Sequence, residues 1–149
     1  MRALVQRVKA ASVTVNQETV ARIGPGLLVF LGVGEEDASD AVDYLAGKIS
    51  RMRIFHDEDG KMNRDVRQAE GEVLVVSQFT LYGDMKRGNR PSFSAAAAPE
   101  KANRLYQAFC EAIRDKNIPV QTGQFAAMMD VELINDGPVT IWLESPGKV

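Results

Sequence analysis

Residues 73–81 read Val73-Leu74-Val75-Val76-Ser77-Gln78-Phe79-Thr80-Leu81, a continuous apolar run that becomes polar at its end. A short apolar run of this kind is typical of a strand that is buried on both faces of a sheet. Where such a strand ends, a rigid element holds the side chains and substrate can still reach them. Ser77, Gln78, Phe79 and Thr80 are therefore candidate site residues. Taken alone, a strand that has simply reached the surface explains them better.

Further strands are predicted on both sides of this stretch. Residues 27–31 form a second continuous apolar run. Two hairpins are also predicted: 2–15 with 19–23 around a turn at 16–18, and 131–134 with 139–143 around a four-residue connection at 135–138.

Two segments have the apolar spacing of amphipathic helices. One covers roughly 38–53, with Asp37 as the predicted N-cap and Asp40 in the capping-box position. The other follows Pro99, a residue that suits a first helical turn, and its apolar positions run from Ala102 to Ile113. Residues 56–67 and 83–93 read as loops. The expected fold is α/β (α+β): one domain over 1–149 with a mainly antiparallel or mixed β-sheet and two helices.

Composition excludes several kinds of site. The 149 residues include one cysteine, Cys110, and one histidine, His56, so neither an internal disulfide nor a zinc site of the usual type can form. We expect His56 to be a surface residue, Cys110 to be packed, and the protein to need no metal and no cofactor. A net charge of −2 argues against bulk binding of nucleic acid. No apolar run reaches the roughly 20 residues of a membrane span, so we expect no membrane partner and a cytoplasmic location.

Two further segments have both an ordinary and a functional reading. Lys86, Arg87 and Arg90 lie on a Gly-rich loop, which is usually just solvated, but guanidinium groups also bind phosphates well. Gly137-Pro138 suits a simple turn. A Gly–Pro bond can also be cis at modest cost, and it would then present two carbonyl oxygens side by side as a rigid acceptor wall.

Five pieces of the chain together carry a resemblance to one family: Arg7-Val8, Ser77–Leu81, Gly88–Phe93, Thr122-Gly123 and Asn135–Thr140. In order and spacing they closely resemble the D-aminoacyl-tRNA deacylases. The resemblance implies a homodimer that acts in translation quality control. Such an enzyme hydrolyses the ester between a D-amino acid, or glycine, and the 3′ end of tRNA.

The resemblance also implies roles for particular residues. A cis Gly137-Pro138 bond would enter the partner's pocket, hold the substrate amino group and exclude L side chains. Beyond the resemblance, we expect Arg7 to brace that turn, although an ordinary strand arginine is nearly as good a reading. We also expect Lys86, Arg87 and Arg90 to contact the tRNA backbone. The chain departs from the family pattern at Ala126, where glycine is expected, and at Asp65, where a small hydroxylic residue is usual.

An aminoacyl ester is already activated, so orienting a water and stabilising the oxyanion can suffice. We expect the backbone N–H groups around Phe79 and Thr80 to face the ester carbonyl, while Ser77 and Gln78 hold the shape of the site. The tRNA 2′-hydroxyl would assist proton transfer. Thr80 is a rival candidate as a covalent nucleophile, but such a hydroxyl needs a base beside it.

Three other classes of function remain open at this point. The chain could be a non-catalytic RNA- or nucleotide-binding module, a hydrolase of free esters or amides, or an interaction protein whose Gly-Pro turn only joins two subunits.

Overall fold

The computed structural model describes residues 1–147. Its elements in chain order are β1 (Arg2–Val15), β2 (Glu18–Ile23), β3 (Gly26–Gly32), α1 (Ser39–Arg51), β4 (Phe55–His56), β5 (Met62–Arg64), β6 (Glu72–Ser77), the 3-10 turn η1 (Phe79–Tyr82), α2 (Pro99–Arg114), β7 (Val120–Thr122) and β8 (Asp130–Glu144).

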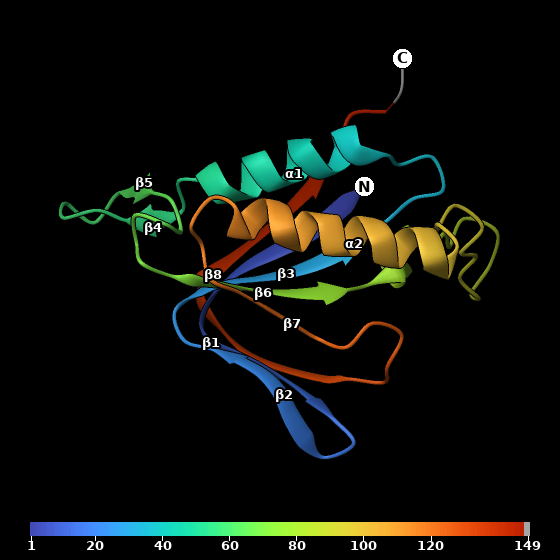
Figure 1. The fold of residues 1–149 in the computed structure, drawn as a ribbon, viewed down its shortest axis with the longest axis horizontal. Helices are drawn as coiled ribbons and strands as arrows, with labels where there is room; N and C mark the ends of the chain where they lie inside the picture. The colour runs from blue at the N-terminus through green and yellow to red at the C-terminus, as the bar shows by residue number, and fades with distance from the viewer. Residues whose placement is uncertain (148–149) are drawn as a thin grey trace.

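A mixed sheet forms the centre of the molecule. Its strand order is β2-β1-β3-β6-β7, and β8 lies along β1. The β1 strand is antiparallel to β2, β3 and β8, whereas β3, β6 and β7 run parallel to one another. The two helices lie together on one face of this sheet (Figure 1). The predicted fold class is confirmed.

The central strands β3 and β6 are buried on both faces of the sheet. Alternate residues of β3 and β6, such as Leu27 and Val73, pack against α1 and α2. Their neighbours in the sequence, such as Leu28 and Leu74, pack on the other face against β2 and the second half of β1. In Figure 1, β2 and the second half of β1 curl away from the helices. The two continuous apolar runs are therefore buried strands, as predicted.

The hairpin predicted over 131–143 is wrong. β8 is one strand that pairs with β1 at both of its ends. Gln6 pairs with Thr140 and Val8 pairs with Asn135, so residues 136–139 all lie opposite Arg7. The turn-forming residues bulge out of a continuing strand instead of reversing it, because both arms pair with β1 and not with each other.

Three local predictions also need correction. Helix α1 begins at Ser39 and has no side-chain cap. Asp37 instead accepts hydrogen bonds from the Gly34 amide at 2.6 Å and the Met1 amino group at 2.6 Å. The segment 56–67, predicted to be a loop, contains β5 and part of the small β4–β5 sheet. The strand β7 was not predicted.

No helix in the described range 1–147 is both long and apolar enough to span a membrane.

Candidate functional site

The polar end of β6 becomes an exposed 3-10 turn. The Gln78 amide still bonds to the Leu31 carbonyl at 2.8 Å, which continues the sheet by one residue. The Leu81 amide then bonds back to the Gln78 carbonyl at 3.3 Å and starts η1. The first N–H groups of such a turn have no acceptor within it, and here they belong to Phe79 and Thr80, whose side chains are exposed. The turn can therefore offer two backbone donors to a ligand.

The side chains of this turn contact one another and the following loop. The side-chain nitrogen of Gln78, Nε2, donates a hydrogen bond to the Thr80 hydroxyl. The Phe79 ring is 55% exposed and lies edge-on to the Phe93 ring, with centroids 4.9 Å apart. A Cβ at Gly83 would lie 3.0 Å from the Thr80 carbonyl oxygen and 3.2 Å from the Phe93 ring. The turn and the loop after it are thus closely packed at their base.

The three basic residues lie on the loop that Phe93 closes. Backbone hydrogen bonds of 2.8 and 2.9 Å between Asp84 and Ser92 tie its two ends together. Lys86, Arg87 and Arg90 are exposed between these ends. None of the three belongs to an ion pair formed within residues 1–147. Their charges are available to an anionic ligand beside η1.

The bulge in β8 carries the Gly137–Pro138 segment, and its peptide bond is cis. Arg7, only 4% exposed, lies beneath it. The Arg7 Nε donates to the Asp136 carbonyl at 2.9 Å, and its Nη1 donates to the Ile54 carbonyl at 2.6 Å. Gly137 and Pro138 themselves are exposed. One buried arginine therefore links the exposed bulge to the segment after α1.

Asn135 holds the same bulge from its other side. Its Oδ1 accepts from the Val139 amide at 2.7 Å, and its Nδ2 lies 3.2 Å from the Val139 carbonyl and 3.0 Å from the Thr140 hydroxyl. Gly137 has a φ of +144°, and a Cβ there would lie 2.8 Å from the Val139 side chain. Only glycine fits at this position. The sequence marked Asn135 only as part of a motif, and no local signal indicated this clamp.

The two groups of predicted site residues do not meet within one chain. Arg2 of β1 bonds to the Leu81 carbonyl of η1, whereas Arg7 of β1 bonds to the bulge in β8. Five residues of extended strand separate these contacts, which is about 16 Å. Ser77–Thr80 and Gly137–Thr140 therefore form two separate surface features.

Cys110 and His56 lie where the sequence predicted. Cys110 is fully buried, and burial raises the pKa of its thiol to about 12, whereas His56 is exposed. In the part of the chain that the structure describes, no three His, Cys, Asp or Glu residues cluster closely enough to hold a metal ion.

Comparison with known proteins extends over nearly the whole chain. Residues 4–144 match the family model described as D-Tyr-tRNA(Tyr) deacylase. A D-aminoacyl-tRNA deacylase of Thermotoga petrophila is 58% identical over 97% of each chain. One of Salmonella typhimurium is also 58% identical, over 97% of this chain and 99% of its own.

Two solved structures share the fold of this chain. A protein described as c-Myc DNA Unwinding Element Binding Protein is 43% identical, with a TM-score of 0.94 over 99% of this chain and 100% of its own. A probable eukaryotic D-amino acid tRNA deacylase has the same fold at 20% identity, with a TM-score of 0.78 over 95% of this chain and 97% of its own. Both the sequence match and the fold lead to one assignment: the chain belongs to the D-Tyr-tRNA(Tyr) deacylase family, a family of hydrolases.

Proposed function

We propose that this chain hydrolyses the ester that joins a D-amino acid to the 3′ end of tRNA, and so removes wrong-handed amino acids before translation uses them. The observation that carries the proposal is the near-complete match to relatives named D-aminoacyl-tRNA deacylase. A cytoplasmic location belongs to the same proposal, because charged tRNA is used there.

In the proposed mechanism, η1 is the place where the ester is cut. The backbone N–H groups of Phe79 and Thr80 stabilise the oxyanion that forms when water attacks the ester carbonyl. Gln78 supports this arrangement, because its side chain bonds to the Thr80 hydroxyl. An amide side chain cannot accept the hydroxyl proton as a base. Thr80 is thus better placed to orient the site than to attack the ester.

The exposed bulge at Gly137 and Pro138 is proposed as the chirality gate. Arg7 and Asn135 hold it from two sides, so its carbonyl oxygens can act as a fixed wall that takes the substrate amino group and leaves no room for an L side chain. Glycine has no side chain to exclude, so glycyl-tRNA should also be cleaved.

This gate serves the partner subunit in the proposal. It lies about 16 Å along β1 from the η1 of its own chain, which is too far to line the same small pocket. Two large apolar side chains of β8, Ile134 and Trp142, flank the bulge and are 58% and 47% exposed. Both features support a homodimer in which β8 lies at the interface.

The basic loop is proposed to contact the tRNA backbone. Lys86, Arg87 and Arg90 are exposed next to the turn that would receive the aminoacylated end. Phosphate contacts of this kind orient a nucleic acid without reading its sequence.

Matched D- and L-tyrosyl-tRNA test the proposal. We expect the purified chain to release D-tyrosine rapidly and L-tyrosine at the rate of buffer alone, with and without EDTA. Binding of the charged tRNA without release would favour a non-catalytic RNA-binding module. Equal cleavage of D-tyrosine ethyl ester would favour a hydrolase of free esters.

A further inference from the structure

We propose that Arg2 and Tyr82, the last residue of η1, form a positioning pair that fixes the orientation of Phe79 and Thr80 for the ester reaction. The inference rests on the proposed function and assigns a task to two side chains that the mechanism above does not use.

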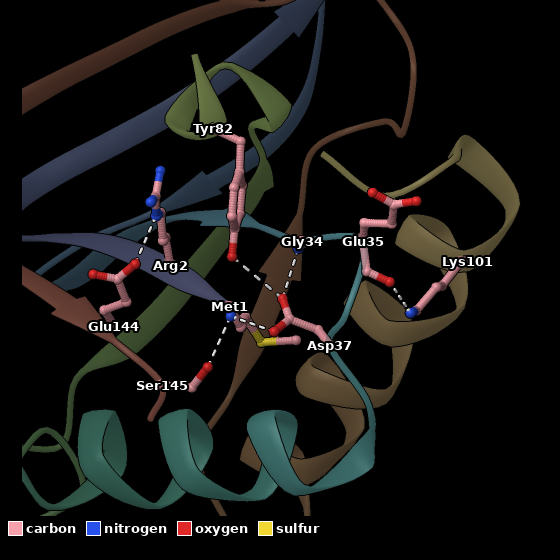
Figure 2. A network of polar contacts seen from close by, with 9 residues as sticks. All are labelled: Met1, Arg2, Gly34, Glu35, Asp37, Tyr82, Lys101, Glu144 and Ser145. Atoms are coloured by element: carbon pink, nitrogen blue, oxygen red, sulfur yellow. Dashed lines mark hydrogen bonds and ion pairs between the residues drawn. The ribbon is translucent and has the colours of Figure 1, made fainter. Parts of the chain in front are cut away.

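Arg2 contacts Leu81 and Tyr82 of the turn, and also Glu144 and the Trp142 ring of β8, whose centre is 5.9 Å from the guanidinium carbon. Its Nη1 donates to the Leu81 carbonyl at 2.9 Å, and its Nε donates to Glu144 at 2.8 Å. The guanidinium carbon lies 4.3 Å from the centre of the Tyr82 ring. Figure 2 shows Arg2 on one side of this ring. A single side chain thus holds both the main chain and the aromatic ring at the end of η1.

Tyr82 is fixed at its other end by Asp37. The hydroxyl donates to the Asp37 Oδ2 at 3.3 Å (Figure 2), and this oxygen also accepts from the Gly34 amide. Burial, followed by the charge of Asp37, raises the pKa of Tyr82 far above its ordinary value. The hydroxyl is therefore protonated at neutral pH and remains a donor to Asp37.

The end of β3 leaves η1 no room to move backward. A Cβ at Gly34 would lie 2.7 Å from the Tyr82 hydroxyl oxygen, and one at Gly32 would lie 3.1 Å from both Leu81 Cβ and the Gln78 carbonyl oxygen. The turn rests directly on glycine backbone. Arg2 and Asp37 hold it against this support, while its front is exposed.

This support matters because η1 is a single turn. Phe79 and Thr80 come immediately before Leu81, so a shift of the Leu81 carbonyl moves both of their N–H groups. A misplacement of about 1 Å at a reacting centre can cost about 100-fold in rate. By contrast, the half-exposed ion pair of Arg2 with Glu144 should contribute little to stability. The contacts of Arg2 with Leu81 and Tyr82 are thus the ones that matter for positioning.

Four variants separate positioning from simple stability. Arg2→Ala removes all four contacts, and Tyr82→Phe removes only the bond to Asp37. Arg2→Lys keeps the charge but cannot bond and stack at once as a guanidinium does. Glu144→Gln is the matched control, because it removes the ion pair and leaves the contacts of Arg2 with Leu81 and Tyr82 in place.

The kinetic readout is steady-state release of D-tyrosine from tRNA, which gives kcat and KM, together with the melting temperature. We expect Arg2→Ala to lower kcat by about 10- to 100-fold with little change in KM. Arg2→Lys should recover part of this loss, Tyr82→Phe should lose less, and Glu144→Gln should stay within about twofold. An unchanged kcat in Arg2→Ala, or an equal loss in Glu144→Gln, would overturn the proposal. If Arg2→Ala does not fold, Arg2→Lys and Tyr82→Phe decide the question in the same way.

A second readout does not depend on activity. The backbone amide NMR signals of Phe79 and Thr80 should shift and broaden in Arg2→Ala and Tyr82→Phe, but not in Glu144→Gln. If the unmodified chain releases no D-tyrosine, the proposed function fails, and these amide signals still test the positioning pair. Unchanged signals in both variants would refute it.

Discussion

The side-chain amide of Asn135 and the main chain of Val139 meet twice across the exposed bulge of β8. The Val139 amide donates to Asn135 Oδ1 at 2.7 Å, and Asn135 Nδ2 donates to the Val139 carbonyl at 3.2 Å. One side chain thereby takes the place of the ladder hydrogen bonds that β8 loses opposite Arg7. The shape of the proposed gate depends on these two hydrogen bonds between Asn135 and Val139.

Asn135→Ala should therefore weaken both the fold and the discrimination between D- and L-aminoacyl-tRNA. The two hydrogen bonds to Val139, at about 1 kcal/mol each, predict a loss of about 2 kcal/mol, and thus a melting temperature lower by about 4–8 °C. The third bond, to the exposed Thr140 hydroxyl, should add little to this. Thermal unfolding followed by circular dichroism measures this directly. The control is Asn103→Ala on α2, which loses only a 3.4 Å bond to Gln107. An Asn135 variant as stable as this control would show that the clamp is unimportant.

Gly137→Ala should damage the proposed gate more severely. The φ of +144° and the 2.8 Å approach to the Val139 side chain leave no space for a methyl group, so the bulge must change shape. We expect D-aminoacyl-tRNA turnover to fall at least about tenfold, since the reacting groups lose their alignment. Gly24→Ala is the control, because nothing lies within 4 Å of a Cβ there. Altered assembly with unchanged selectivity would instead support a role only in joining subunits.

Thr80→Ala should keep most of the turnover. The Thr80 hydroxyl accepts from Gln78 and has no base beside it, so we expect a loss of less than about tenfold. Loss of a true covalent nucleophile costs about 10⁴-fold or more. Single-turnover deacylation of D-tyrosyl-tRNA distinguishes the two. A complete loss of activity in a variant that still binds charged tRNA would make Thr80 the nucleophile.

Neutralising Lys86, Arg87 and Arg90 together should weaken tRNA binding and reduce its dependence on salt. Each lost phosphate contact lowers the slope of log K against log salt by about 0.7–0.9, so the triple variant should lose about 2–3 units. Filter binding between 50 and 200 mM KCl measures the slope. A charge-matched triple variant of Lys48, Arg51 and Arg104 on the helices is the control. An equal change of slope in both variants would mean that the basic loop has no special role.

Stability should fall as the pH rises above about 9. Burial raises the pKa of Cys110 and of Tyr106 to about 12, from ordinary values of 9.0 and 10.0. The folded state therefore binds protons that the unfolded chain releases, and the free energy of unfolding decreases between these values. Urea midpoints from pH 7 to 11 should show the decrease. In Cys110→Ala it should begin about one pH unit later, and an identical profile would contradict the assignment to this thiol. The native thiol should also resist alkylation at pH 8.

Patterns that involve neighbouring residues predicted the fold well. The runs at 27–31 and 73–76 are buried strands, and both helices lie where the apolar spacing placed them. The errors concern contacts with distant parts of the chain. The residues 135–138 have the same turn chemistry whether the strand reverses or bulges, and only pairing with β1 distinguishes the two. The strand β7 has three residues directly after Pro119, too few for a periodic signal.

The same contrast between local patterns and distant contacts applies to the candidate site. Ser77–Thr80 and the Gly-Pro segment stand out because polar or turn-forming residues interrupt apolar strands. Asp37 was expected to cap a helix, but its carboxylate instead meets Tyr82, which is 45 residues away in sequence. Arg2 gave no signal at all, since an arginine at the start of a strand is ordinary. Its contacts exist only because β1 pairs with β8 and because η1, which follows β6, comes within reach of the first residue of β1.

The number of residues between Arg2 and Arg7 in β1 also restricts where residues can be inserted into this protein or deleted from it. One inserted residue would reverse the side of the sheet on which every following side chain lies, and two would move Arg7 by about 7 Å relative to Arg2. The turn of the β4–β5 hairpin can gain or lose residues without such an effect. Insertions and deletions among relatives should therefore collect in this hairpin and avoid the five residues that set the spacing.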